Sequence, residues 1–352
     1  MTNSSVLSDF YIAKYDLNGT VLWAKSSGGS LNDYGTAISL DATGVYVVGS
    51  FLSSSISFGA VALTNAGSSD LFVVKYNSSG NVIWAKKGGG NSAEYATSVA
   101  SDPTGIYVTG SFSSASVTFG STTLNNSGAS NIYIVKYTTN GNVIWAKKEG
   151  GYSYLRSNYI YTYSSSVYLT GYFGDSTIVF GSTTLLNSNP MYPDTFVAKY
   201  DANGNNIWAK SAHGDASDDG TSLCVSSSGV YVTGNFDYSM YFDSTFLNSV
   251  FNAPYLIYLA KLSYSTGIDE LGVSSSLTNV SPNPFTSQTT LTFYKEGKYT
   301  IKITDVLGKE IKTITFSGKE YILERGEMEK GIYFLQIMDE NKNVRNKKIV
   351  VQ

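Results

Sequence analysis

The sequence predicts an all-β protein, with a β-propeller-like repeat domain followed by a small Ig-like β-sandwich. Three observations favour this fold class. The four tryptophans recur at spacings of 61, 61 and 63 residues, as Trp23, Trp84, Trp145 and Trp208, and a fixed period of this length is typical of stacked or radially arranged units. No long stretch has the 3.6-residue apolar period of a helix. Finally, the charge balance changes sharply near residue 279, which indicates a second domain.

Composition limits the classes of function. A chain of 352 residues can hold two domains with a substantial core. Its net charge of −3 gives no broad attraction to nucleic acid or to an anionic membrane. The single cysteine, Cys224, excludes an intramolecular disulfide. No apolar run approaches the ~20 residues that span a bilayer, so neither nucleic acid nor a transmembrane segment is expected.

Each repeat reads as four short strands. Residues 72–76 and 81–86 predict a hairpin whose turn ends in Gly80, where a positive φ is expected. A third strand is predicted near 96–100 and a fourth over 106–112. An extension over 117–124 is expected to form an extra hairpin or a long loop at one rim.

Four strands per period is the composition of a propeller blade. The Trp strand occurs four times, but the strand that precedes it occurs five times, around Lys14, Lys75, Lys136, Lys199 and Lys261. This count predicts four full units of about 61 residues plus a partial blade, as a closed ring or an open arc. The repeated tryptophans, and the glycines at the same place in each fourth strand, are predicted to be structural: Gly49, Gly110, Gly171 and Gly234.

These repeats resemble a known family. The pattern Asp-x-Phe-x-x-Lys-Tyr, then Gly, then Trp-Ala-Lys, then Gly-Gly, then Gly-(Val/Ile)-Tyr-Val-x-Gly-x-Phe is similar to the bacterial seven-bladed β-propeller (SBBP) repeats. The resemblance covers roughly residues 9–262 and implies a propeller domain over 1–262. The third unit departs from the pattern, because residues 152–157 replace the acidic-aromatic segment that the first unit has at 32–35.

The tail differs from the repeats in charge. Residues 1–278 hold 12 Lys and Arg against 18 Asp and Glu, whereas residues 279–352 hold 12 against 9. We therefore predict a linker over 263–278 and a C-terminal domain over 279–352. Short alternating strands are expected at 290–294, 299–303, 311–316, 331–337 and 348–351, which is the pattern of a small β-sandwich.

The tail also resembles a known family, the type A sorting domain of the type IX secretion system of Bacteroidetes. The matching blocks are Val-Ser-Pro-Asn-Pro-Phe at 280–285, Asp-Val-Leu-Gly-Lys at 305–309, Lys-Gly-Ile-Tyr at 330–333 and Lys-Lys-Ile-Val-Val-Gln at 347–352. The resemblance implies export to the outer-membrane surface or secretion, with the type IX machinery as partner. The motif residues are Pro282, Asn283, Pro284, Asp305, Gly308, Gly331, Tyr333, Lys347 and Lys348.

Such cargo carries a signal peptide, whereas Met1 to Ser5 has neither a charged region nor an apolar one. From this we expect a fragment or a misplaced start, with further blades upstream.

For each residue that could bind a ligand, a purely structural role is also possible. The tryptophans could stack on sugars, but their place in every unit favours packing between blades. Asp16–Gly19 and Asp201–Gly204 look like the start of a calcium loop, yet the other two copies keep only the glycine, which favours turn chemistry.

The densest acidic cluster is Asp215, Asp218 and Asp219, beside the only histidine, His213. Paired carboxylates could hydrolyse glycosides or bind a cation, although an acidic residue is ordinary in this loop. Cys224, in an apolar strand, is expected to pack rather than react. We predict no catalytic site, metal or cofactor.

The sequence therefore predicts an exported binding or scaffold protein of the cell surface, delivered by its tail, with a glycan or protein ligand on the propeller loops. A glycan-active propeller enzyme that uses Asp215 to Asp219 is an alternative, and a structural adhesin or stalk segment is another. Specificity is expected where the units differ, in the rim extensions and the loops between blades.

Overall fold

The computed structural model describes residues 7–151, 155–187, 189–243, 245–248, 255–262, 277–306, 308–339 and 344–352. The chain divides into two compact units, 1–264 and 265–352, each of which is described by itself. Most of the predicted linker, 263–276, lies outside the described residues, as do 152–154 of the third repeat and Leu307 of the tail motif. Among the described residues, no helix is long and apolar enough to cross a membrane.

In the described part of the repeat unit, five antiparallel sheets form the blades, apart from small hairpins described below. The first is β1 (Phe10–Tyr15) and β2 (Val21–Ser27). The second is β3 (Asp33–Asp41), β4 (Gly44–Phe51), β7 (Asp70–Tyr76) and β8 (Val82–Gly88). The third is β9 (Glu94–Asp102), β10 (Gly105–Phe112), β13 (Asn131–Tyr137) and β14 (Val143–Glu149). The fourth begins with β15 (Leu155–Tyr163), β16 (Ser166–Phe173), β19 (Asp194–Tyr200) and β20 (Asn206–Gly214), and the end of β20 pairs further with the hairpin of Ser239–Phe242 and Thr245–Asn248, which extends this sheet to six strands. The fifth is β21 (Asp218–Ser226), β22 (Gly229–Phe236) and β25 (Leu256–Leu262).

A small hairpin is inserted between the second and third strands of each of the last four sheets. The four hairpins are β5 (Ser55–Phe58) with β6 (Val61–Thr64), β11 (Ser116–Phe119) with β12 (Thr122–Asn125), β17 (Thr177–Phe180) with β18 (Thr183–Leu186), and β23 (Ser239–Phe242) with β24 (Thr245–Asn248). The all-β repeat architecture is confirmed, and the predicted extension is a hairpin.

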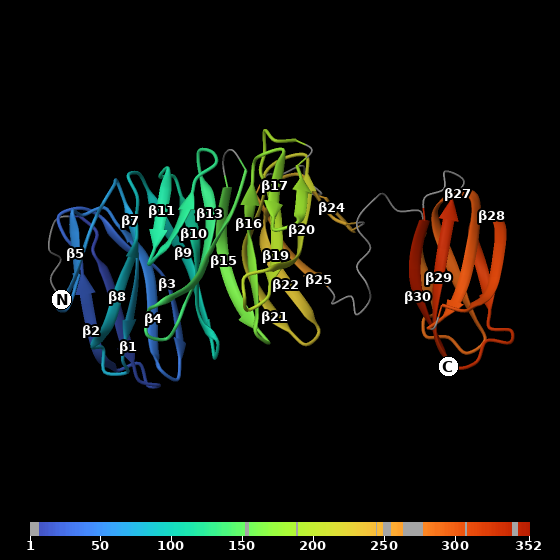
Figure 1. Ribbon diagram of the computed structural model, residues 1–352, viewed down its shortest axis with the longest axis horizontal. Helices are drawn as coiled ribbons and strands as arrows, with labels where there is room; N and C mark the ends of the chain where they lie inside the picture. Colours follow the sequence, from blue (N-terminus) through green and yellow to red (C-terminus); the bar gives the residue numbers. More distant parts are fainter. Residues whose placement is uncertain are drawn as a thin grey trace. The chain divides into compact units, whose positions relative to one another are not determined.

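The sheets follow one another in a row, and the first and last sheets lie at opposite ends of the repeat unit (Figure 1). The first strands of successive sheets, β3, β9, β15 and β21, contact one another in order. Four apolar cores lie along this row, and each is shared by two neighbouring sheets. Of the two arrangements predicted, the described sheets therefore form an open array of blades, in which stability comes from contacts between neighbours.

The glycine repeated in the second strand of each sheet lies opposite a bulge. A Cβ on Gly49 would lie 2.6 Å from the Phe72 ring, and one on Gly234 would lie 2.8 Å from the Tyr258 ring. A Cβ on Gly110 would lie 2.7 Å from the Tyr133 hydroxyl. At all four positions, including Gly171, a carbonyl oxygen of the adjacent strand lies closer still. A side chain would therefore displace the neighbouring backbone, which is why this position needs glycine.

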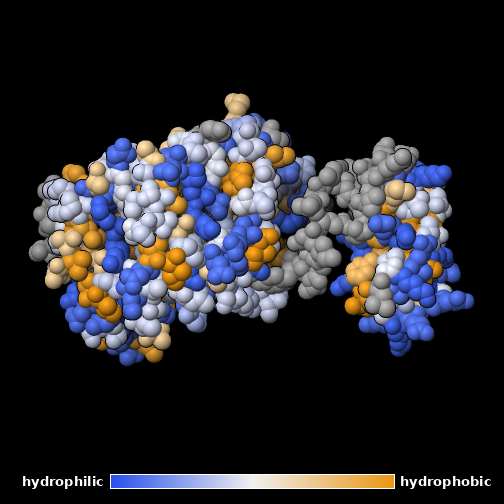
Figure 2. Space-filling view, viewed as in Figure 1, coloured by the Kyte–Doolittle hydropathy of each residue, from blue (hydrophilic) through white to orange (hydrophobic). Residues whose placement is uncertain are grey.

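The two end sheets expose faces that the inner sheets bury. Ile257 and Leu259 of β25 are 79% and 75% exposed, whereas Leu71 of the inner strand β7 is fully buried. At the other end, Figure 2 shows apolar side chains, in orange, over the part of the repeat unit that carries β1 and β2, where Leu17 and Leu22 are exposed. Both end faces thus keep the apolar character of an interface between blades.

The C-terminal unit is a five-stranded antiparallel sheet folded around its own core. Its strands are β26 (Leu277–Ser281), β27 (Gln288–Asp305), β28 (Glu310–Glu324), β29 (Gly331–Asp339) and β30 (Val344–Val351). The first half of β27 pairs with β26 and the end of β28, and its second half pairs with β29 and the start of β28. Both halves line one apolar core, as in a small sandwich.

One detail of the predicted tail is wrong. The sequence predicts separate strands at 290–294 and 299–303, but β27 runs without a break through both. Its pairing with β28 shifts register between Thr292 and Gly297, so the charged and glycine residues there form an irregularity within the strand rather than a turn. Phe293 and Tyr299, on either side of it, stack at 4.1 Å between ring centroids.

Candidate functional sites

Three of the tryptophans donate a hydrogen bond to the next blade, whereas Trp208 packs on Tyr168 of its own sheet. The indole Nε1 of Trp23 donates to the Ser78 carbonyl, that of Trp84 to Thr139 and that of Trp145 to Ala202, each at 3.1 Å. All three acceptors lie in the turn between the last two strands of the following sheet. The indole therefore uses its only hydrogen-bond donor within the protein.

The lysine and the glycine of the repeat complete the same contact. Lys75 Nζ donates to the Thr139 carbonyl at 3.0 Å, the acceptor that Trp84 also uses. A Cβ on Gly141, which has a φ of +79°, would lie 2.8 Å from the Trp84 ring. The equivalent glycines Gly80 and Gly204 meet Trp23 and Trp145 in the same way. One face of each of these indoles is thus covered by a neighbouring turn, so the motif joins blades.

The two turns that look like calcium loops bind their own backbone. Asp16 Oδ1 accepts the amides of Asn18 and Thr20 at 2.9 and 2.8 Å, and Asp201 Oδ1 accepts those of Asn203 and Asn205 at the same distances. The pKa of the Asp16 carboxyl is lowered, chiefly because it accepts the hydrogen bond from the Thr20 amide. The arrangement is an Asx turn that caps the hairpin.

The acidic cluster near His213 does not form one open pair of carboxylates. Asp215 is exposed and accepts a hydrogen bond from Ser239 Oγ at 3.0 Å. Asp219 Oδ1 accepts both the amide and the side-chain nitrogen of Asn235, whereas Asp218 is fully buried. His213 is exposed and stacks on Tyr241. In the described parts of the chain, no three His, Cys, Asp or Glu side chains are arranged as a metal site.

The expectation that Cys224 packs in the interior is wrong. Cys224 lies in β21 between Leu223 and Val225, both of which are buried, and its own side chain is exposed. The alternation of a strand with one solvated face places it outside.

Buried acids lie between the blades, a feature that the sequence pattern did not reveal. Asp33, Glu94 and Asp218 begin β3, β9 and β21, and each is at most 1% exposed. Burial and the nearby carboxylates of Asp194 and Asp237 raise the pKa of Asp218 to about 8. Burial raises the pKa of Asp194 to about 7.

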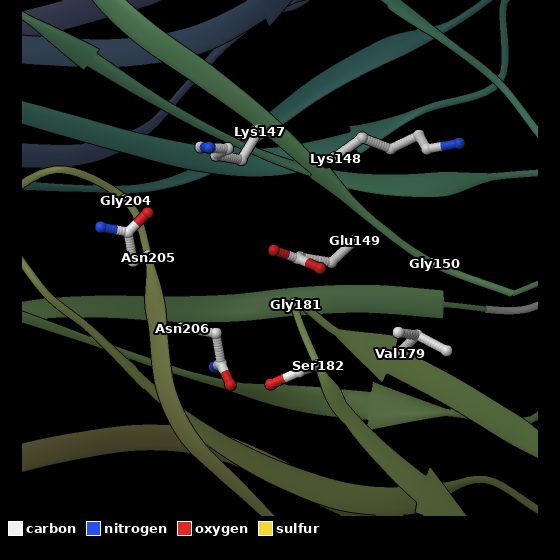
Figure 3. Close-up of a pocket in the computed structure, with 10 residues that line it drawn as sticks. All are labelled: Lys147, Lys148, Glu149, Gly150, Val179, Gly181, Ser182, Gly204, Asn205 and Asn206. Carbon is white, nitrogen blue, oxygen red and sulfur yellow. The ribbon is translucent and has the colours of Figure 1, made fainter.

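A pocket of about 520 Å³ lies between the third and fourth blades, and polar residues make up most of its lining. Its walls are the end of β14, the turn of the β17–β18 hairpin and the start of β20. Figure 3 shows the Glu149 carboxylate between β14 and the segment of Gly181 and Ser182, with Lys147 and Lys148 extending in opposite directions above it. The complete lining is Lys147, Lys148, Glu149, Gly150, Val179, Gly181, Ser182, Gly204, Asn205 and Asn206.

Glu149 is the buried titratable group of this pocket. Burial raises its pKa to about 7, although the nearby Tyr200 hydroxyl, the Gly181 amide and the two lysines act in the opposite direction. Asn206 is fixed by hydrogen bonds from its side-chain nitrogen to the Lys199 and Trp208 carbonyls, at 3.3 and 3.2 Å. The pocket thus offers a carboxyl group that titrates near neutrality beside fixed amides.

The interface between the second and third blades is built from the same strands and turns as this one, but different residues line it. Pairing along the strands places Gly88 at the position of Glu149, and Val143 at the position of Asn206. The turn glycine contacts this second residue at each interface, as Gly120 does with Val143 and Gly181 with Asn206. In the sequence, Glu149 and Asn206 are visible only as two departures from the repeat pattern, and neither belongs to a catalytic motif.

The tail motif blocks meet in space. Asn283 Nδ2 donates to the Lys348 carbonyl at 3.0 Å, and the Val350 amide donates to Asn283 Oδ1 at 2.8 Å. The Pro-Asn-Pro segment therefore lies along β30, the last strand. Pro282, Pro284, Lys347 and Lys348 are exposed there.

The other motif residues shape the fold of the tail. Asp305 Oδ1 accepts the Lys309 amide at 2.9 Å in a turn where Gly308 has a φ of +81°. Gly331 begins β29, where Tyr333 is buried in the core and donates its hydroxyl to the Glu329 carbonyl. A Cβ on Gly308 would meet no atom within 4 Å, so only its backbone conformation requires glycine.

Comparisons with known proteins give partial matches to this chain. A WD repeat-containing protein of Acanthamoeba polyphaga mimivirus is 27% identical over 232 residues, which are 54% of this chain and 17% of that protein. The endo-acting ulvan lyase of Formosa agariphila is 33% identical over 89 residues, 25% of this chain and 17% of the lyase. The chain thus spans less than a fifth of these relatives. The resemblance to SBBP repeats stays a prediction.

Solved structures with similar features are distant in sequence. PorZ, a surface component of the type IX secretion system of Porphyromonas gingivalis, is 10% identical with a TM-score of 0.21, over 90% of this chain and 59% of PorZ. The dihydro-heme d1 dehydrogenase NirN is 11% identical with a TM-score of 0.30, over 97% of this chain and 71% of NirN. The fold is therefore described from the strand pairing of this chain.

The tail gives a family match. Residues 279–352 match the model of the secretion system C-terminal sorting domain, which is the segment where all four motif blocks lie. The last 74 residues are therefore a type IX secretion sorting domain, and this tail marks the protein for export to the cell surface or for secretion.

Proposed function

We propose that the protein is an exported binding module, in which the tail delivers a blade array whose pocket beside Glu149 binds a polar, hydroxyl-rich ligand such as a glycan. One observation carries this proposal. The pocket lies at an interface that shares its frame with the others, yet Glu149 and Asn206 replace a glycine and a valine there. Fixed polar groups in a concave site are what orient a small ligand.

The chemistry of the lining supports a glycan. Ser182, Asn205 and Asn206 supply hydroxyl and amide groups, and Lys147 and Glu149 supply a charged donor and a titrating carboxyl. Such groups pair with sugar hydroxyls as donors and acceptors. The tryptophan rings are not proposed to stack on sugars, because the repeated contact places their faces against the turns of neighbouring blades.

The exposed edge of the tail is proposed to contact the secretion machinery. Pro282, Pro284, Lys347 and Lys348 lie on the surface around β30, where Asn283 holds the two motif blocks together. A solvent-exposed edge strand can also pair with a strand of a partner protein.

Binding is favoured over glycoside hydrolysis at the Asp215 to Asp219 segment. Retaining and inverting glycosidases both need two carboxyl groups that face the same open cleft. Here Asp215 is exposed, while Asp218 lies in the interior between two blades.

A glycan array probed with the full chain tests the proposal. We expect a discrete set of bound glycans, and loss of that binding in the double variant Glu149→Gly/Asn206→Val, which restores the residues of the preceding interface. Lys86→Ala, at the position of Lys147 one blade earlier, is the matched control and should bind normally. Binding that survives the double variant in a folded protein would place the ligand elsewhere, and an array that stays blank with the unaltered chain would refute a glycan ligand.

A further inference from the structure

Four equivalent contacts between blades place the start of one sheet's third strand beside the start of the next sheet's first strand. The residue pairs at these contacts are Asp9 with Asp33, Asp70 with Glu94, Asn131 with Leu155, and Asp194 with Asp218. Backbone hydrogen bonds hold the two strand starts together, as from the Glu94 amide to Ser69 and from the Asp218 amide to Pro193, both at 2.8 Å. Three of the four contacts therefore bury acidic side chains.

At the first two contacts, the protein supplies partners for these acids. Asp33 accepts hydrogen bonds from the Gly29 amide at 2.8 Å and from the amide and hydroxyl of Ser53 at 3.2 and 2.8 Å. Asp70 Oδ2 is paired with Lys87 Nζ at 2.6 Å, while its Oδ1 accepts no hydrogen bond from a described residue. Burial of a carboxylate is tolerated when such donors or a cation compensate for the lost hydration.

The last contact keeps the acids but lacks those partners. Strand pairing places Ser211 where Lys87 stands, since Phe72 faces Lys87 and Phe196 faces Ser211. The position of Ser53, two residues after the second strand's last phenylalanine, is Tyr238. The hydroxyl donor and the lysine are thus both missing from the Asp194–Asp218 contact.

The Asp218 carboxylate is left without a partner. Its side chain is 0% exposed, and neither of its oxygens accepts a hydrogen bond from any described residue. Asp194 is 2% exposed, and its Oδ2 is likewise unpaired within the described part of the chain. The Asp237 amide lies near Asp218, but it donates to the Ser217 carbonyl at 3.0 Å.

A main-chain oxygen faces the same space. A Cβ on Gly214 would lie 2.8 Å from Asp218 Oδ2 and closer still to the Ser239 carbonyl oxygen. The absence of a side chain at Gly214 thus lets the carboxylate and the carbonyl oxygen approach the same point. Asp237 and Asp219 add further negative charge around Asp218.

We propose that Asp194 and Asp218 bind a calcium ion between the fourth and fifth blades, with the Ser239 carbonyl oxygen as a third ligand and water in the remaining positions. Calcium takes six to eight oxygen ligands in flexible geometry, from carboxylates, carbonyls and water. The ion stands in for the charge that Lys87 provides at the second contact. With only two acidic side chains, a Kd of about 10⁻⁴ to 10⁻³ M is expected, as for extracellular calcium modules.

Calorimetric titration of the full chain with CaCl2, after removal of bound metal with EGTA, tests the proposal. We expect one site per chain, and a rise of about 2–4 °C in the Tm of the repeat domain at saturating calcium. Asp218→Asn should remove both effects. Glu94→Gln, which neutralises the equivalent acid at the second contact, should leave calcium binding unchanged.

A second variant restores the partner that the other contact has. Ser211→Lys should supply the missing charge, abolish calcium binding and leave a folded chain whose Tm no longer responds to EGTA. The proposal is overturned if the unaltered chain binds no calcium. A higher Tm of Asp218→Asn in that case would indicate that a shared proton satisfies the pair. The proposal is equally overturned if calcium binds with the same affinity to Asp218→Asn.

Discussion

Residues that recur in the repeat domain and residues of the tail motif differ in what surrounds them. Trp84 is 8% exposed and touches Gly141 and Thr139 of the next blade, so packing accounts for its presence. Lys347 and Lys348 of the tail are exposed, and the turn of Gly308 has open space around it. Internal contacts thus account for the repeated residues, whereas much of the tail motif lies on a surface that a partner can reach.

This difference separates two kinds of recurring pattern. A pattern that repeats within one chain reports the contact that the chain makes with itself. A pattern that matches other proteins at exposed positions points to recognition. Substitutions in the first kind should change the free energy of unfolding, and substitutions in the second kind should change export at constant stability.

The largest expected effect on stability is at a repeated tryptophan. Trp84→Ala should lower the free energy of unfolding by about 3–5 kcal/mol, because a buried indole leaves a cavity. Urea denaturation followed by tyrosine fluorescence and circular dichroism measures it. Lys86→Ala, an exposed change two residues away, is the control, with an effect within about 0.5 kcal/mol. Equal effects of the two changes would refute the role of the indole as a contact between blades.

The next effect depends on pH. The pKa of Glu149 is raised to about 7 by burial, so the folded state holds this proton more tightly than the unfolded state. Its contribution to stability is therefore full below about pH 4.5 and is lost as the pH rises to about 7. Glu149→Gln should raise the free energy of unfolding at pH 8 by up to about 3 kcal/mol and have little effect at pH 4.

Denaturation of both proteins at the two pH values measures this difference. Lys147→Ala is the control, since it removes a charge that favours ionised Glu149 and should shift stability the opposite way at pH 8. An equal gain from Glu149→Gln at pH 4 and pH 8 would contradict burial of the charged form as the cause.

A smaller effect is expected at the lysine of the blade contact. Lys75 is 4% exposed and donates to the Thr139 carbonyl and to Thr43 Oγ1, with its ammonium group over the Tyr46 ring. Lys75→Met should cost about 2 kcal/mol in thermal denaturation. Lys14→Met alters the same contact at an exposed position and should cost less than about 0.5 kcal/mol. The comparison fails if the exposed lysine matters as much as the buried one.

The smallest expected effect on stability is in the tail motif. Lys347→Ala/Lys348→Ala should change the free energy of unfolding by less than about 0.5 kcal/mol, because both side chains are exposed. The same change should lower the amount of protein that reaches the cell surface. A loss of stability of several kcal/mol, measured on the purified chain, would mean that these lysines serve the fold of the tail.

The sequence predicted the repeat architecture because the same residues recur at a fixed period, and four copies reveal which positions the fold requires. It did not predict the pocket, because Glu149 and Asn206 become adjacent only when β14 packs against the next blade. Nor did it reveal that Asp218 is buried without a partner, since that depends on which residues of the neighbouring strands, such as Ser211, stand opposite it in the folded chain.

In the tail, the motif blocks were predicted, but their meeting along β30 was not. Asn283 and Val350 are 67 residues apart in the sequence, and only the folded strand order brings them together. The continuous β27 was missed for a similar reason. The charged residues just before Gly297 have the composition of a turn, but they form an irregularity inside a strand that pairs with β28 on both sides of it.

The most direct test is export of a reporter protein by the tail alone. Residues 265–352 form a compact unit with its own core, so they can be fused behind a signal peptide and a fluorescent reporter in a type IX-competent host. We expect the reporter to reach the cell surface or the medium, and the same fusion with Lys347→Ala/Lys348→Ala to be exported less. A reporter that stays in the periplasm, with the tail intact and folded, would contradict this expectation.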